Sequence, residues 1–189
     1  IASHGFLVIS AGRLEDPSLE VGPQENPAVR RPGDPPAAPA VPAPPGSARS
    51  RRSTADHMRQ AIDWAITRHT AAGSVLRGRL DPARIAVAGQ SCGGGLSMQL
   101  AGDPRVTAVG IFNSGSRLTG APGGPGGGDP AAAKARLDAV HTPILFVTGD
   151  ADLDIAFPGA RDSFEYLSRV PVFWAWQERL QHIGTYGAP

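Results

Sequence analysis

The sequence contains a single cysteine, Cys92, and a single lysine, Lys134, among its 189 residues. One cysteine excludes an internal disulfide and a cysteine-rich zinc site, and it leaves the cellular compartment open. No apolar run approaches the roughly 18 residues of a membrane-spanning helix, so we expect no membrane span. The 18 basic and 17 acidic side chains give a formal net charge of +1. This balance lacks the electrostatic footprint of a nucleic-acid-binding protein, and the composition leaves the oligomeric state open.

Proline is distributed very unevenly along the chain. Ten of the nineteen prolines lie between Pro17 and Pro45. A segment of this composition cannot bury a core and is typical of disordered or polyproline-like chain. A length of 189 residues is enough for one domain with a sizeable core. We therefore predict one domain over residues 1–189, with a proline-rich surface insertion over residues 15–52.

Short apolar runs alternate with segments of helical periodicity in the rest of the chain. We expect strands over residues 5–10, 84–88, 106–112, 143–148 and 170–176, and helices from residue 53 or 54 onward, around 96–100, and over 131–139 and 163–167. Residues 5–10 are apolar apart from Ser10, which favours a fully buried strand. Strands that alternate with helices predict an α/β domain with a mostly parallel sheet and helices on both faces.

The most informative motif is the pentad Gly89-Gln90-Ser91-Cys92-Gly93, which has the pattern G-x-S-x-G. It stands between the strand expected at 84–88 and the helix-like stretch around 96–100. This is the context of a nucleophile elbow, in which a serine lies on a sharp, strained turn. The residues flanking the serine must be small, because the strand and the helix approach each other closely there. The pentad therefore makes Ser91 a candidate nucleophile.

An acid and a histidine follow the pentad in the order that such an elbow requires. Asp150, Asp152 and Asp154 come directly after the strand expected at 143–148. The end of a strand is where a parallel sheet places its ligands. His182 follows the last expected strand, so the order is Ser, Asp, His. Any one of the three acids taken alone is more simply read as a solvated turn residue, so position alone leaves the choice of acid open.

These segments together resemble the α/β-hydrolase superfamily, in its dienelactone-hydrolase-like and esterase branch. Residues 2–8 resemble the family's fourth strand, 81–95 its fifth strand and elbow, 153–156 its acid loop and 182–186 its histidine loop. The resemblance implies a partial α/β-hydrolase fold interrupted by the proline-rich insertion. It also implies a serine esterase that cleaves a small carboxylic ester through an acyl-enzyme, with no metal or organic cofactor.

Carried over to this sequence, the resemblance implies a role for each site residue. Ser91 would be the nucleophile, His182 the base and Asp154 the acid that orients the imidazole. The backbone N–H of Cys92 would donate to the oxyanion. Asp150 is the alternative acid, because many hydrolases of this fold place the acid directly after the strand.

Two further alternatives concern the same two loops. Asp152 is the third choice of acid. Cys92 could itself be the nucleophile, as in dienelactone hydrolases proper. In that register Gln90 would occupy the first glycine position of the pentad, so the elbow fits Ser91 better.

The sequence also departs from the family pattern. In the family the second oxyanion donor comes from a loop after the third strand, and this loop precedes the segment that resembles the fourth strand. We therefore expect strands one to three and this donor to be missing, and the 189-residue chain to be poorly active alone. The alternative functions are a lactonase or peptidase with the same three residues, or a catalytically incomplete fragment that acts as an interaction protein.

Overall fold

The computed structural model describes residues 4–10, 53–119 and 129–182. The chain divides into two units, residues 1–53 and residues 54–189. All helices and strands named below belong to the second unit. The proline-rich segment predicted over residues 15–52 lies outside the described residues.

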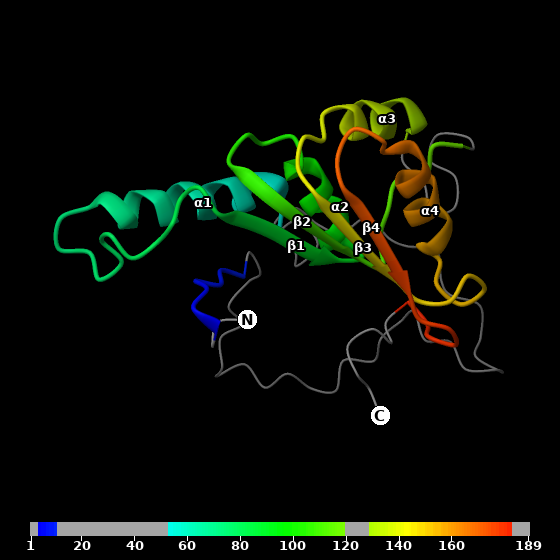
Figure 1. Ribbon diagram of the computed structural model, residues 1–189, viewed down its shortest axis with the longest axis horizontal. Coiled ribbons are helices and arrows are strands. Elements are labelled where there is room, and N and C mark those ends of the chain that lie inside the picture. The colour runs from blue at the N-terminus through cyan, green and yellow to red at the C-terminus, as the bar shows by residue number, and fades with distance from the viewer. Residues whose placement is uncertain (1–3, 11–52, 120–128, 183–189) are drawn as a thin grey trace, which may run out of the picture. The chain divides into compact units, whose positions relative to one another are not determined.

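A four-stranded parallel sheet forms the centre of the second unit (Figure 1). Its strands are β1 (Ile85–Gln90), β2 (Val106–Phe112), β3 (Ile144–Thr148) and β4 (Val172–Trp176). Their order in the sheet is β1-β2-β3-β4, and each neighbouring pair is parallel. The predicted parallel α/β sheet is therefore confirmed. Because all strands point the same way, the segments that follow them meet at one edge of the sheet.

In the described part of the chain, four helices accompany the sheet: α1 (Ala55–Thr70), α2 (Cys92–Leu100), α3 (Pro130–Asp138) and α4 (Phe157–Tyr166). A capping box starts α1, because the Thr54 hydroxyl accepts from His57 N at 3.3 Å while His57 Nδ1 accepts from Thr54 N at 3.2 Å. Asp129 caps α3, since its carboxylate accepts from Ala131 N at 3.0 Å.

The helix predicted at 163–167 is present but begins earlier, at Phe157. Pro158 and Gly159 indicate a turn in the sequence, yet proline fits the first turn of a helix because no N–H is needed there. Gly159 allows α4 to approach the segment after β2, where its backbone contacts Gly115. Tertiary packing therefore extends α4 beyond its local sequence signal.

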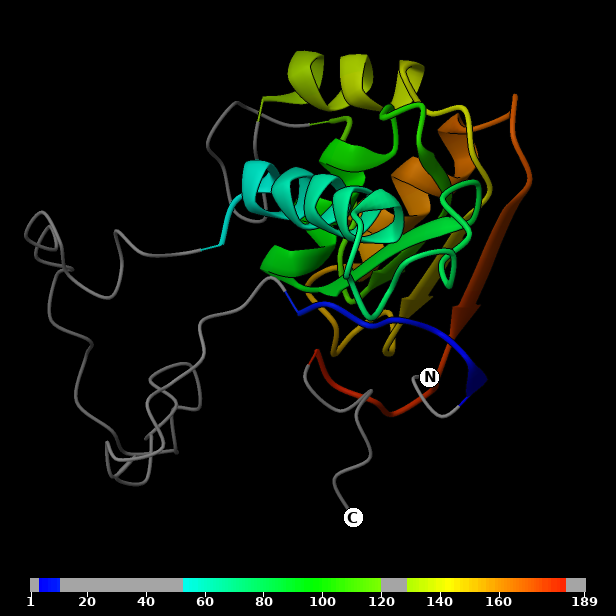
Figure 2. The same ribbon diagram turned by 90° about the vertical axis from the view of Figure 1, so that its left-hand side faces the viewer.

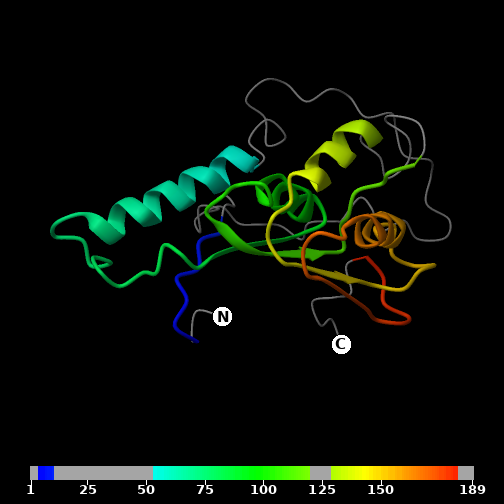
Figure 3. The same ribbon diagram turned by 45° about the horizontal axis from the view of Figure 1, so that its top comes forward.

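Among the residues that the structure describes, helices cover one face of the sheet (Figures 2 and 3). The covered face carries the core, including Val87, Ile111, Ile144 and Phe146. Side chains that alternate with these point the other way, and Phe173 on that face is 62% exposed. We expected helices on both faces. Within residues 53–119 and 129–182, all four helices lie on the side of the buried residues.

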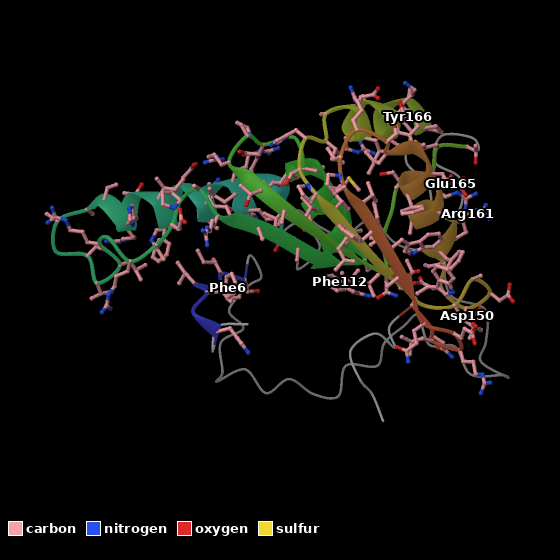
Figure 4. All side chains as sticks on the ribbon, viewed as in Figure 1. Phe6, Phe112, Asp150, Arg161, Glu165 and Tyr166 are labelled. Carbon is pink, nitrogen blue, oxygen red and sulfur yellow. The ribbon has the colours of Figure 1, made fainter. Side chains whose placement is uncertain are left out.

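The prediction of a buried strand at residues 5–10 is wrong. The structure assigns no strand to residues 4–10, all of which are exposed; Phe6, for example, is 62% exposed (labelled in Figure 4). Apolar composition favours a buried strand only when another strand supplies hydrogen-bond partners for its backbone. Within the described part of the chain, every strand that pairs belongs to the sheet β1–β4.

Candidate active site

Ser91 lies on the sharp turn between β1 and α2. Its backbone has φ 52° and ψ −115°, a conformation that non-glycine residues rarely adopt. Two hydrogen bonds hold this turn, since Ser91 N donates to Phe112 O at 2.9 Å and Gly95 N donates to Ser91 O at 3.2 Å. This strained backbone is the geometry expected of a nucleophile elbow.

Close packing around the turn explains two of its glycines. A Cβ on Gly89 would collide with the backbone of Gly93, and a Cβ on Gly94 would collide with the Ser114 side chain. Gly93 itself faces open space, where a Cβ would meet nothing within 4 Å. Small residues are thus required at Gly89 and Gly94, whereas we expected the requirement at the two glycines of the pentad, Gly89 and Gly93.

A continuous chain of hydrogen bonds joins the serine, the histidine and one aspartate. His182 Nε2 lies 3.0 Å from Ser91 Oγ, and His182 Nδ1 lies 2.7 Å from Asp154 Oδ1. With Nδ1–H donating to the carboxylate, Nε2 is left as the acceptor for the serine hydroxyl. The His182 side chain is 23% exposed and that of Asp154 is fully buried. This arrangement can remove a proton from Ser91 as the hydroxyl attacks an electrophile.

The buried Asp154 carboxylate accepts four hydrogen bonds. Oδ1 accepts from His182 and from Ala156 N at 2.9 Å, and Oδ2 accepts from Asn113 Nδ2 at 2.7 Å and from Gly149 N at 2.8 Å. Burial raises the pKa of Asp154, but these four donors outweigh burial and hold the pKa below its usual range. Asp154 therefore carries the negative charge that can stabilise a protonated His182.

Asp150 and Asp152 do not reach the histidine ring. The Asp150 carboxylate accepts from Asp152 N at 3.0 Å and from Arg179 N at 2.7 Å, and these donors lower its pKa. Asp150 lies in the loop after β3 (Figure 4), and its contact with Arg179 N ties that loop to the segment after β4. The Asp152 side chain is exposed. Among the three acids, the structure brings Asp154 to His182.

No family model and no curated protein matches this sequence. The structure is similar to solved structures of hydrolases. An acylaminoacyl peptidase from Pyrococcus horikoshii matches with a TM-score of 0.53 and 16% identity, over 69% of this chain and 24% of that chain. The chain has a partial α/β-hydrolase fold.

Other structures with the α/β-hydrolase fold match with lower TM-scores. A dienelactone hydrolase from Anabaena variabilis matches with a TM-score of 0.47 and 23% identity, over 70% of this chain and 50% of that chain. The esterase domain of a Rhodothermus marinus protein matches with a TM-score of 0.48 and 13% identity, over 70% of this chain and 62% of that chain. The chain thus spans half the length of the dienelactone hydrolase and about a quarter of the peptidase.

Two polar residues of this α/β-hydrolase fold were not among our candidate site residues. Asn113 directly follows β2 and contacts Asp154. Gln90 ends β1, and its Nε2 donates to the backbone carbonyl of His182 at 3.2 Å. Their positions at the carboxyl ends of two parallel strands are the sequence signal that could have found them.

Cys92 begins α2 directly after Ser91, and its thiol is exposed. The first N–H groups of a helix have no acceptor within the helix, so the Cys92 N–H points out of the N-terminal end of α2. A cavity of about 260 Å³ adjoins this turn and is lined by Cys92, Leu96, Arg117 and Arg136, among others. Ser91 and His182 are not among its lining residues, so the cavity lies beside the hydrogen-bonded chain rather than over it.

Within residues 4–10, 53–119 and 129–182, no group of three or more His, Cys, Asp or Glu side chains is placed to hold a metal ion. In the same ranges, no helix has the length and apolar character needed to cross a membrane.

Proposed function

We propose that this chain is a serine hydrolase that cleaves carboxylic esters through an acyl-enzyme. The observation that supports this most directly is the hydrogen-bonded chain from Ser91 through His182 to Asp154, with distances of 3.0 and 2.7 Å. It joins a hydroxyl on a strained turn, an imidazole that can accept its proton and a buried carboxylate. A serine hydroxyl is a poor nucleophile until a base within hydrogen-bond reach takes its proton.

Acylation follows from these positions. Ser91 Oγ attacks the ester carbonyl carbon and its proton passes to His182 Nε2, which leaves an oxyanion on a tetrahedral carbon. The imidazolium then gives that proton to the departing alkoxide oxygen as the C–O bond breaks, and the acyl group stays on Ser91. Asp154 stabilises the imidazolium through Nδ1–H. Water then repeats the sequence on the acyl-enzyme and releases the carboxylic acid.

The first turn of α2 supplies part of the oxyanion stabilisation. The Cys92 N–H begins a nine-residue helix, and helix N-termini attract negative charge because their N–H dipoles are aligned. An oxyanion formed on a substrate attached to Ser91 lies next to this turn. One well-placed donor of this kind typically contributes about 100- to 1,000-fold to kcat. Because the donor is a backbone group, changing the Cys92 side chain leaves it in place.

Covalent labelling with a fluorophosphonate probe tests the nucleophile directly. Ser91→Ala should abolish labelling, and Cys92→Ala should label like the parent chain because its backbone N–H remains. Both variants should be checked for an unchanged thermal unfolding midpoint. Persistent labelling of a folded Ser91→Ala chain, or loss of labelling only in Cys92→Ala, would contradict the assignment of Ser91.

Turnover then decides the substrate class. A lactone or a peptide bond presents the same kind of carbonyl to Ser91, and an acylaminoacyl peptidase shares this fold. Initial rates should be compared for a p-nitrophenyl butyrate ester, a five-membered lactone and an N-acetyl-alanine anilide. We expect ester cleavage to be fastest, because p-nitrophenoxide leaves more easily than the alkoxide of a lactone, and an alkoxide leaves more easily than an amine. Labelling without turnover of any of the three would instead support the catalytically incomplete alternative.

A further inference from the structure

Asn113 is a buried polar residue that follows β2 and contacts Asp154, which lies in the loop after β3. It follows β2 directly and is 1% exposed. Its Nδ2 donates to Asp154 Oδ2 at 2.7 Å across 41 residues of sequence, and its backbone N donates to Val147 O at 2.8 Å. The side chain therefore reaches the acid from a backbone that is itself fixed to β3.

The backbone of Asn113 suits asparagine in particular. Its φ is 44°, in the left-handed region that most side chains avoid. Asparagine is several-fold enriched in that region among non-glycine residues. It also carries an NH2 group at the distance needed to reach Oδ2, whereas glycine accepts the same backbone but offers no donor. Backbone and side chain thus each favour asparagine here.

The other donors to Asp154 differ from Asn113 in origin. The N–H groups of Gly149 and Ala156 belong to the same loop as the aspartate, and would move with it. His182 is the group that the acid must orient. Asn113 is the donor that comes from β2, the strand next to the one that carries Ser91. It therefore fixes the orientation of the carboxylate relative to the nucleophile's side of the sheet.

The number of acceptor sites on the Asp154 carboxylate also indicates that Asn113 fixes its orientation. An ionised carboxylate has about four acceptor sites, and Asp154 has four donors. Two donors on Oδ2 hold that oxygen away from the imidazole, so Oδ1 faces His182. Loss of the Asn113 amide would leave one acceptor site of a buried charge unfilled, and the carboxylate could rotate about its Cβ–Cγ bond.

We propose that Asn113 is a positioning residue that holds the Asp154 carboxylate in the orientation that His182 requires. The inference rests on the proposed hydrolase function for its kinetic consequence, but not for its structural one. Asn113 does not touch the substrate and acts through Asp154.

Asn113→Gly is the main test, because glycine keeps the left-handed backbone and removes only the amide. Loss of a hydrogen bond to a charged group should lower ester kcat by about 10- to 100-fold with KM unchanged. Independently of turnover, the Asp154 carboxyl carbon should titrate at higher pH in protein labelled with ¹³C-aspartate, because a donor to the charged form is gone. Thr107→Ala is the matched control, since it removes a side-chain hydrogen bond from β2 to Ile85 O without touching Asp154.

Asn113→Asp gives a second, pH-dependent readout and retains the side-chain shape. While it is protonated, the new carboxyl can donate to Asp154 Oδ2 much as the amide does. Its deprotonation removes the donor and places a second negative charge beside the first. We therefore expect kcat/KM of this variant to fall on the alkaline side at a pH where the parent chain is still fully active.

The outcomes separate the two proposals. A raised Asp154 titration in Asn113→Gly, with Thr107→Ala like the parent, supports positioning by Asn113 whether or not the chain cleaves esters. Absence of ester turnover in the parent would count against the proposed function alone. A folded Asn113→Gly chain with parental Asp154 titration and parental kcat would overturn the role of Asn113. If Asn113→Gly does not fold, the pH profile and the carboxyl titration of Asn113→Asp decide in its place.

Discussion

Replacing Asp154 by asparagine exchanges one carboxylate oxygen for an NH2 group and removes the negative charge. Each oxygen of Asp154 now accepts two N–H donors, so the new NH2 must face either the pair from His182 and Ala156 or the pair from Asn113 and Gly149. Either orientation sets donor against donor. If the NH2 faces His182, the imidazole must adopt the other tautomer, and Nε2 then carries a proton and cannot accept one from the serine.

The size of the effect can be estimated from these contacts. Loss of the correct tautomer lowers kcat by about 10⁴-fold in a serine protease with a Ser-His-Asp triad, which corresponds to about 5.5 kcal/mol of transition-state stabilisation. Stability should fall as well, because two hydrogen bonds to a buried charge become donor–donor contacts. At roughly 1.5–3 kcal/mol for each charged hydrogen bond, Asp154→Asn should lower the free energy of unfolding by about 3–6 kcal/mol.

Asp150→Asn is the matched control for this prediction. Asp150 lies four residues earlier in the same loop and also accepts two backbone N–H groups, but it does not contact His182. Its replacement should lower kcat by less than about tenfold, because only the loop contact is weakened. Initial rates with p-nitrophenyl butyrate at pH 8 and urea unfolding of each variant measure both effects. Near-parental kcat in folded Asp154→Asn, together with a thousandfold loss in Asp150→Asn, would refute the choice of acid.

Two further predictions concern the contact between Gln90 and His182 and the ion pair between Asp103 and Arg105, in the segment between α2 and β2. Gln90→Met keeps the size of the side chain but removes the donor to the His182 carbonyl, so kcat should fall about two- to tenfold, with Asp154 titrating as in the parent; an unchanged kcat would show that this contact does not hold His182. Asp103→Asn should destabilise the fold, since the hydrogen bond from Arg105 lowers the pKa of Asp103 to about 2 from 3.8. A depressed carboxyl pKa adds stability above the unfolded pKa, so the deficit should be about 2 kcal/mol at pH 7 and shrink as pH falls from 4 to 2. Urea unfolding at pH 7 and pH 2.5 would contradict this if the deficit were the same at both.

Local sequence signals predicted most of the second unit. All four strands of the sheet begin and end within two residues of the predicted bounds, because buried strands in a parallel sheet are short, apolar and β-branched. Capping residues at the starts of α1 and α3, Thr54 and Asp129, are likewise local signals, because each accepts a hydrogen bond from a backbone N–H of the first helical turn. The order of the pentad, the acidic loop and the histidine also indicated which side chains could meet, since parallel strands end at one edge of the sheet.

The sequence was less informative wherever a partner distant in the chain decides the outcome. Residues 5–10 have the composition of a buried strand, but backbone hydrogen bonds to another strand decide whether one forms. Asn113 looks like an ordinary strand-end residue until β2 is known to lie between β1 and β3. Asp150 and Asp154 share one loop, and only the backbone course of that loop decides which carboxylate faces the histidine and which one accepts from Arg179 N.

The loop after β3 and the segment after β4 are fastened to each other at several points. Asp150 N donates to Leu180 O at 2.8 Å, Arg179 N donates to the Asp150 carboxylate, and a Cβ on Gly149 would collide with the Leu180 carbonyl. The loops that carry Asp154 and His182 are therefore held together by several contacts, whereas among the described residues the contacts between His182 and the segment around Ser91 are two, from Ser91 Oγ and from Gln90 Nε2. When these segments fluctuate, we expect the 3.0 Å hydrogen bond between Ser91 Oγ and His182 Nε2 to break before the one between His182 and Asp154. The base would then stay aligned with its acid while the nucleophile is disengaged.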